Sequence, residues 1–225
     1  MHLIAEKKIS GVPAIIRQLL KDADFPVAPK LWVSRIGGSE QVVIGWTEGD
    51  RPFDFILPGY EHLGLRPDAE IIPFRLVARV LNRKVTGSLR RLEQIRQDCP
   101  GTLVHLESPP PISDTSYAQE HLDVWFERSG QPLKVAPATL RWKLWKLQTR
   151  LTRALCDSFD IPYLASPPVI LAHDGYLAQR FWSKDATHGN TAYGTVINEF
   201  IAEYAANMVG GTHDKITFLY RSAGL

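Results

Sequence analysis

The sequence predicts an α/β fold, a single domain built on a mainly parallel sheet with helices on both faces. Short apolar segments, punctuated by Gly or Pro, alternate along the chain with long segments of helical periodicity. That alternation is typical of a parallel sheet that is covered on both sides. The 225 residues, of which 44% are hydrophobic and 22% charged, suffice for one sizeable core. One domain spanning residues 1–225 is therefore expected.

Three segments have the short, apolar or β-branched composition of buried strands. They are residues 31–36 (LWVSRI), 102–107 (TLVHLE) and 161–165 (IPYLA), with residues 2–5 as a shorter fourth candidate. Proline runs follow the second and third of these segments and force the chain out as loops. Such loops leave the carboxyl ends of parallel strands, where α/β proteins build their sites.

Four segments between and after the strands have helical periodicity. They are residues 12–20, roughly 68–97, 140–159 and 190–208. The third carries leucines at spacings of three and four, and the fourth carries a core-facing stripe of Tyr193, Ile197, Ile201, Tyr204 and Met208. The mixed, Pro-bounded residues 112–138 are expected to form a surface excursion or lid and not a domain boundary.

Composition excludes several classes of function. The net charge of +2 provides no broad basic field, so nucleic acid is not the expected partner. No window approaches 18 uninterrupted apolar residues and the N-terminus lacks a signal-peptide apolar region, which predicts a soluble cytoplasmic protein without an integral membrane segment. Cys99 and Cys156 lack metal-ligand spacing, and no phosphate-cradling glycine motif occurs. We therefore expect no metal and no cofactor.

The loop sequence DATHGNTAYG, residues 185–194, carries the candidate chemistry. Asp185 and His188 are three positions apart just before a predicted helix, so both side chains can point to one side of a turn. An acid held there can orient the imidazole and stabilise the imidazolium that forms when His takes a proton. The alternative is structural, with Asp185 capping the helix and His188 on the surface.

Three blocks of the sequence, within roughly residues 100–210, resemble the SGNH/GDSL hydrolase family. They are HLESPPPI at 105–112, YLASPP at 163–168 and the DATHGNTAYG loop. The resemblance implies a flavodoxin-like three-layer α/β/α sandwich, with Asp185 as the acid and His188 as the general base. It also implies an ester hydrolase or acyltransferase that acts on a small ester or an O-acylated saccharide.

The nucleophile block of that family has no clear counterpart, because the sequence contains no Gly-Asp-Ser. RIGGSEQ, residues 35–41, is the Gly-Ser element that follows a predicted strand, and two placements of it are open. In the first, Ser39 is the nucleophile and the backbone N–H of Gly38 helps to hold the oxyanion. In the second, Ser39 replaces an Asn of a later block, the first strand with its nucleophile lies upstream of Met1, and the bare sheet edge predicts a homo-oligomer.

Other polar residues have weaker claims on the site. Glu107 and Ser108 follow the second strand and Asn190 follows the Asp-His pair, so all three are candidates for substrate contacts. The basic segment 141–153 is expected to be an amphipathic helix with a solvated cationic face. If the serine is absent, the alternative function is a catalytically silent SGNH-like domain that binds a ligand or a protein partner.

Overall fold

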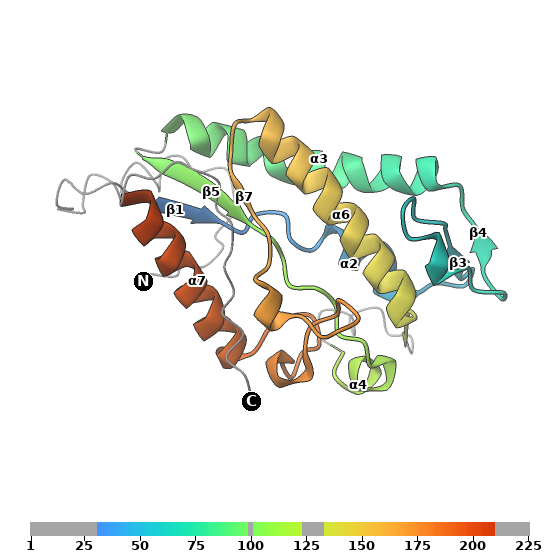
Figure 1. Cartoon of the computed structure of the whole chain (residues 1–225). Helices are drawn as coiled ribbons and strands as arrows, with labels where there is room; N and C mark the ends of the chain where they lie inside the picture. The colour runs from blue at the N-terminus through green and yellow to red at the C-terminus, as the bar shows by residue number, and fades with distance from the viewer. Residues whose placement is uncertain (1–30, 99–100, 123–132, 210–225) are drawn as a thin grey trace.

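The computed structural model describes residues 31–98, 101–122 and 133–209 (Figure 1). The predicted strand at 2–5, the predicted helix at 12–20 and Cys99 lie outside these residues. Within them the fold class is confirmed, since the chain forms a mixed α/β structure with a mainly parallel sheet. No helix in the described ranges is long and apolar enough to cross a membrane.

The central sheet has three strands, β1 (Leu31–Ser34), β5 (Thr102–Leu106) and β7 (Tyr163–Leu164), in the order β1-β5-β7. All neighbours are parallel, with Leu31 opposite Thr102 and His105 opposite Tyr163. The strands predicted at residues 31–36, 102–107 and 161–165 are confirmed, and each is shorter than predicted. Strand β7 keeps only two residues, because Pro162 lacks an N–H and Pro167 lies shortly beyond its end.

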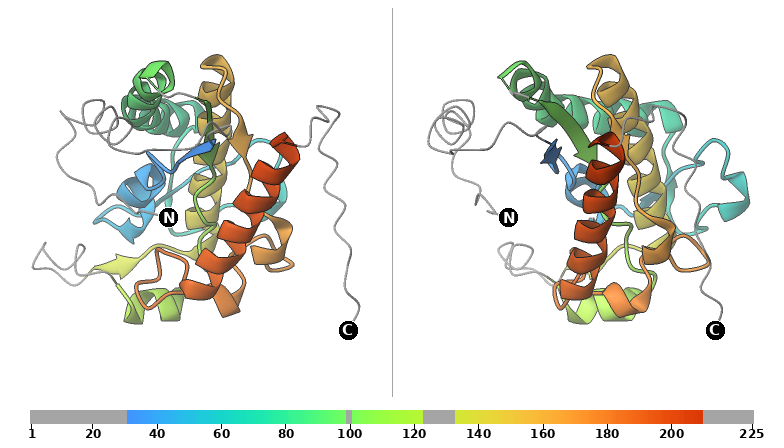
Figure 2. Two further views of the ribbon diagram at one scale, coloured as in Figure 1. Left: turned by 90° about the vertical axis from the view of Figure 1, so that its left-hand side faces the viewer. Right: turned by 60° about the vertical axis from the view of Figure 1, so that its left-hand side comes forward.

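Helices cover both faces of this sheet (Figures 1 and 2). Leu103 of β5 belongs to a core that includes Leu81 of α3 (Phe74–Asp98) and Leu144 of α6 (Ala138–Ser158). The next residue, Val104, belongs to a second core with Ile197 of α7 (Thr191–Val209). Successive strand residues point to opposite faces, so β5 separates the two cores and the architecture has three layers.

The remaining elements are short. Helix α2 (Glu40–Gly45) follows β1 after a glycine turn, and α4 (Thr115–Glu120) follows β5. Strand β2 (Thr47–Glu48) pairs with β6 (Lys134–Val135) in antiparallel fashion, and β3 (Phe53–Asp54) pairs with β4 (Glu70–Ile71) in parallel fashion. Single turns of 3-10 helix occur at η2 (Glu61–Leu63), η3 (Pro168–Ile170) and η4 (Gln179–Phe181).

Two predictions about helices differ from the structure, one in a boundary and one in the burial of its cations. Helix α3 begins at Phe74 and not near residue 68, because β4 occupies residues 70–71 and Pro73 precedes the first turn. Helix α6 has only part of the expected solvated cationic face along 141–153, since Arg150 and Arg153 are exposed whereas Arg141 is 2% exposed and Lys143 is fully buried. The two buried cations contradict the prediction. The charges of Arg141 and Lys143 are satisfied inside the protein, mostly by partners from distant parts of the chain.

Lys143 donates hydrogen bonds to Asp54 Oδ1 at 2.9 Å, to Phe55 O at 3.1 Å and to Gly64 O at 2.7 Å. The Arg141 guanidinium bonds the carbonyls of Ala136 and Ile112, each at 3.0 Å. These hydrogen bonds attach α6 to the segment 54–64 and to the backbone at Ile112 and Ala136. The segment 112–138 takes part in the core as well, because Ile112, Ala118 and Val135 are buried.

Candidate active site

The Asp-His loop is fixed to the rest of the molecule by the side chain of Asn190. Its Nδ2 donates to the carbonyls of Arg180 at 2.8 Å and Trp182 at 3.1 Å, and its Oδ1 accepts from Tyr193 N at 3.1 Å in the first turn of α7. A bridge between Trp182 and Gly189 closes the base of the loop. Asn190 therefore uses both ends of its amide to shape the loop, and its substrate contact stays a prediction.

The structure brings Asp185 and His188 together as a hydrogen-bonded pair. His188 Nδ1 lies 2.9 Å from Asp185 Oδ2, and the His188 backbone N–H donates to Asp185 Oδ1 at 2.9 Å. The side chain of His188 is 67% exposed and that of Asp185 is 36% exposed. The carboxylate is thus held on one side while the far edge of the imidazole faces solvent.

The hydrogen bonds decide the ionisation of Asp185. Partial burial on its own would raise the pKa of this carboxyl, but the bonds from the His188 backbone and ring, together with the Thr187 backbone N–H, lower the pKa below its ordinary value of 3.8. Asp185 is therefore ionised at neutral pH. An ionised carboxylate only accepts hydrogen bonds, so His188 Nδ1 carries the proton in this pair.

Ala186 gives the loop its sharp turn. Its φ of 56° is in the left-handed region, which non-glycine residues rarely adopt. Ala186 is 2% exposed and belongs to the core on the α7 side of the sheet. The buried methyl group of Ala186 thus anchors the turn in the core, while the side chains of Asp185 and His188 on either side of it are partly exposed.

Glu107 and Ser108 lie just after β5. Glu107 is 6% exposed, accepts from Tyr163 Oη at 3.1 Å and accepts from Ser166 N at 2.8 Å. Burial and the neighbouring Glu107 both raise the pKa of Tyr163 above its ordinary value. Glu107 therefore joins the loop after β5 to β7 through one oxygen and to the loop after β7 through the other. Its predicted substrate contact stays a prediction.

Gly38 lies against Ser108, since a Cβ added to Gly38 would be 3.2 Å from the Ser108 Cβ. The half-buried Ser108 and the glycine turn after β1 are therefore neighbours at the carboxyl edge of the sheet. This is the edge at which the sequence predicted the site. The proposed oxyanion contact of the Gly38 N–H is not tested by this arrangement.

Ser39 is exposed at the start of α2, where its carbonyl accepts from Val42 N at 3.0 Å. It lines an open depression with residues of α3, among them Arg83, Ser88 and Arg91. Among the described residues, no hydrogen bond joins the Ser39 hydroxyl to His188. The structure therefore does not bring Ser39 together with the pair, and its role as nucleophile stays a prediction.

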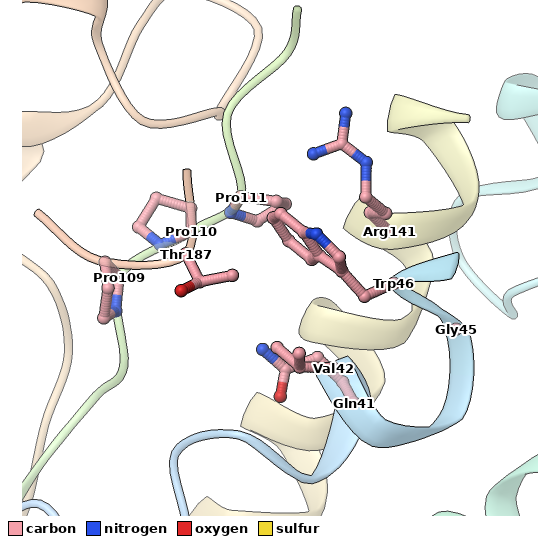
Figure 3. Close-up of a pocket in the computed structure, with 9 residues that line it drawn as sticks. All are labelled: Gln41, Val42, Gly45, Trp46, Pro109, Pro110, Pro111, Arg141 and Thr187. Atoms are coloured by element: carbon pink, nitrogen blue, oxygen red, sulfur yellow. The ribbon is translucent and has the colours of Figure 1, made fainter. Parts of the chain in front are cut away.

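A small cavity of about 20 Å³ opens beside the Asp-His loop (Figure 3). Thr187 and the proline run after β5 form one side of it, and α2 and α6 form the other. The full lining is Gln41, Val42, Gly45, Trp46, Pro109, Pro110, Pro111, Arg141 and Thr187. Trp46 Nε1 and Gln41 Oε1 are buried without hydrogen-bond partners among the described residues. The cavity therefore offers one polar donor and one polar acceptor.

The cavity residues from α2 and α6 were not predicted from the sequence. Gln41 and Trp46 follow the glycine turn, so their nearness to that turn was the one available signal. Nothing in the sequence connects them to Thr187, which is more than a hundred residues away. No group of three or more His, Cys, Asp or Glu side chains in the described ranges is arranged to hold a metal ion.

These features define an α/β protein with an acid-histidine pair at the carboxyl edge of a parallel sheet. Among solved structures, a similar chain is a GDSL-like lipase from Bacteroides thetaiotaomicron, with a TM-score of 0.38 and 12% sequence identity. The match covers 61% of this chain and 62% of that one, so the chain spans less than two thirds of the lipase. No family model matches the sequence, and no curated protein sequence matches it.

Proposed function

We propose that this protein is an ester hydrolase or acyltransferase in which His188 is the general base and Asp185 orients it. The hydrogen bond of 2.9 Å between His188 Nδ1 and Asp185 Oδ2 carries the proposal. With Nδ1 protonated, the lone pair of Nε2 is free to take a proton from a nucleophile. The ionised Asp185 then stabilises the imidazolium that forms.

In this proposal Ser39 supplies the nucleophilic hydroxyl and the Gly38 N–H contributes to an oxyanion hole. Acyl transfer needs a nucleophile within reach of the base and donors that face the developing oxyanion. The substrate is a small ester or an O-acylated saccharide.

A second candidate function is a silent domain that binds a ligand or partner without catalysis. The position of Ser39 favours it. Ser39 and Val43 line a depression with α3, whereas Gln41 and Val42 line the cavity with Thr187. Within the described residues, Ser39 and the Asp-His loop therefore line two different hollows. Attack by Ser39 requires α2 to turn that hydroxyl toward His188.

Hydrolysis of p-nitrophenyl acetate and of an O-acetylated saccharide by the full chain tests the first proposal. His188→Ala should lower kcat/KM by roughly 10³-fold or more, and Asp185→Asn by roughly 10²- to 10⁴-fold, because each removes part of one acid-base unit. His62→Ala is the matched control. His62 is an exposed histidine in η2, and its loss should leave the rate unchanged.

Labelling with a fluorophosphonate identifies the nucleophile. An adduct on Ser39 that disappears in His188→Ala supports the full proposal, and Ser39→Ala should then abolish hydrolysis. An adduct on another serine keeps the base and reassigns the nucleophile. If there is no adduct and no hydrolysis above buffer, the protein is the silent domain.

A further inference from the structure

The outer face of α3 concentrates positive charge. The helix carries seven cationic residues and two acidic ones, although the net charge of the whole chain is only +2. Six of the cations are exposed, namely Arg75, Arg79, Arg83, Lys84, Arg90 and Arg91. The buried side chains of α3, such as Leu81 and Leu89, lie on the opposite side of the helix. Helix α3 lies at the edge of the molecule in every view (Figures 1 and 2).

These six cations have no acidic partners within the described residues. The salt bridges there involve Arg51, Arg66, Lys134, Lys143 and His188, and none involves a residue of α3. The parts of the chain outside the described ranges carry six acidic and eight basic residues. By composition, these parts therefore have no excess of negative charge.

Aliphatic side chains are exposed among these cations. Leu76 is 47% exposed and Val80, one turn further along, is 51% exposed. Val43 of α2 is 53% exposed and lines the same open depression as Arg83 and Lys84. Half-exposed Leu and Val in the middle of a charged face are not explained by solvation of the cations alone.

We propose that the outer face of α3, together with Val43, binds the surface of a membrane that contains anionic phospholipids. Guanidinium groups pair with phosphate oxygens in a bidentate manner, and a cluster of four to eight cations on an amphipathic helix is typical of such binding. The aliphatic side chains enter the boundary between headgroups and acyl chains. The 25 residues of α3 form a rod of about 37 Å that lies along the membrane plane.

The aliphatic residues favour a membrane over a nucleic acid. A protein that binds single strands presents exposed aromatic rings on which bases stack. The large hydrophobic side chains that are exposed in the described ranges are all Val, Ile or Leu. This membrane contact is separate from catalysis at His188, and it holds equally for an active enzyme and for a silent domain.

Flotation of the full chain with vesicles tests the proposal. We expect binding to vesicles of phosphatidylcholine with about 30% phosphatidylserine, much less binding to phosphatidylcholine alone, and release by 0.5 M salt, since each surface cation contributes to such binding and salt screens it. Arg79→Glu with Arg83→Glu should weaken the partition coefficient by about 25-fold or more. Lys184→Glu with Arg153→Glu is the control, because it changes the net charge equally at exposed positions outside α3.

A second variant distinguishes binding to a membrane from binding to other polyanions. Leu76→Ser with Val80→Ser should lower vesicle binding several-fold while every charge is kept. Unchanged melting temperatures exclude misfolding as the cause in each variant. The proposal is overturned if both double charge variants bind vesicles equally well, if serine at 76 and 80 has no effect, or if the protein binds a fluorescent 20-nucleotide RNA and not the vesicles.

Discussion

Individual charged residues inside this protein depend on partners that are far away in sequence. Asp54 is buried and receives hydrogen bonds from Phe55 N at 2.7 Å, Arg66 N at 2.9 Å and the fully buried Lys143 ammonium at 2.9 Å. A buried ion pair contributes little net stability compared with an apolar pair. Loss of one partner is different, because it leaves the other charge buried and uncompensated.

Lys143→Met should therefore lower the free energy of unfolding by about 3–5 kcal/mol, measured by urea denaturation. The same substitution at the exposed Lys84 of α3 should change it by less than about 0.5 kcal/mol. Addition of Asp54→Asn to Lys143→Met should restore part of the loss, since it removes the stranded carboxylate. A double variant that is less stable than Lys143→Met alone would contradict this account.

His105 is the residue whose burial has a measurable pH signature. It is 3% exposed in β5, its ring stacks on Tyr163 with centroids 5.9 Å apart, and its Nδ1 has no hydrogen-bond partner among the described residues. Burial lowers the pKa of His105 from 6.5 to about 4.

As the pH falls from about 6.5 to about 4, His105 binds a proton in the unfolded chain but not yet in the folded protein. Acid therefore favours unfolding in this pH range. The contribution of His105 to stability is present in full above pH 6.5 and should decline by about 3 kcal/mol as the pH falls to about 4. His105→Gln should flatten the dependence of the free energy of unfolding on pH by that amount. His62→Gln, at an exposed site, should leave the curve of the wild-type protein intact.

At the scale of elements, the long helices and the three parallel strands could be predicted because their signal is local. Helices α6 and α7 repeat apolar residues at the helical period, and β1 and β5 are short apolar runs between Gly and Pro. The two-residue strands have no such signal. Strand β2 is a strand only because β6, almost ninety residues later, pairs with it, and a pairing of that separation leaves no local pattern.

Helix α3 allows the two sides of an amphipathic helix to be compared directly. Leu81 is fully buried and Leu76 is 47% exposed. Leu81→Ala should cost about 2–5 kcal/mol of unfolding free energy, because the surrounding core cannot fully collapse into the cavity. Leu76→Ala should cost less than about 0.5 kcal/mol. Equal losses in urea denaturation would mean that α3 does not pack as described.

At the scale of the whole molecule, β5 joins the two cores. Leu103 packs on the side of α3 and α6, and Val104 and Leu106 pack on the side of α7. Loss of β5 therefore exposes both cores together. Leu103→Ala and Val104→Ala should each shift one common unfolding transition, monitored by circular dichroism and by Trp fluorescence. Two separate transitions would contradict the prediction that residues 1–225 form one domain.

The candidate site could be predicted only where its residues are close together in the sequence. Asp185 and His188 are three residues apart in one loop, so their spacing predicted that both side chains can point to one side of a turn, and the family resemblance of the surrounding blocks assigned their roles. The cavity beside them combines α2, the proline run and α6, and its members meet only because β1 and β5 are neighbours in the sheet. The exposed cationic face of α3 was not predicted, because composition does not show which of two basic helices is exposed. The segment 141–153 is also basic and is more aromatic, but Arg141 and Lys143 are buried there because Asp54 and backbone carbonyls are their partners.

The buried methyl group of Ala186 has a consequence for how the Asp-His loop meets a ligand. A loop that is ordered only when a ligand arrives loses conformational entropy at that step, and its affinity is reduced accordingly. Here the turn is held in a core pocket with φ at 56°, so Asp185 and His188 keep their relative positions before any ligand binds. Ala186→Gly would relax the backbone and remove the methyl group from the core. The loop would then sample several conformations in place of one.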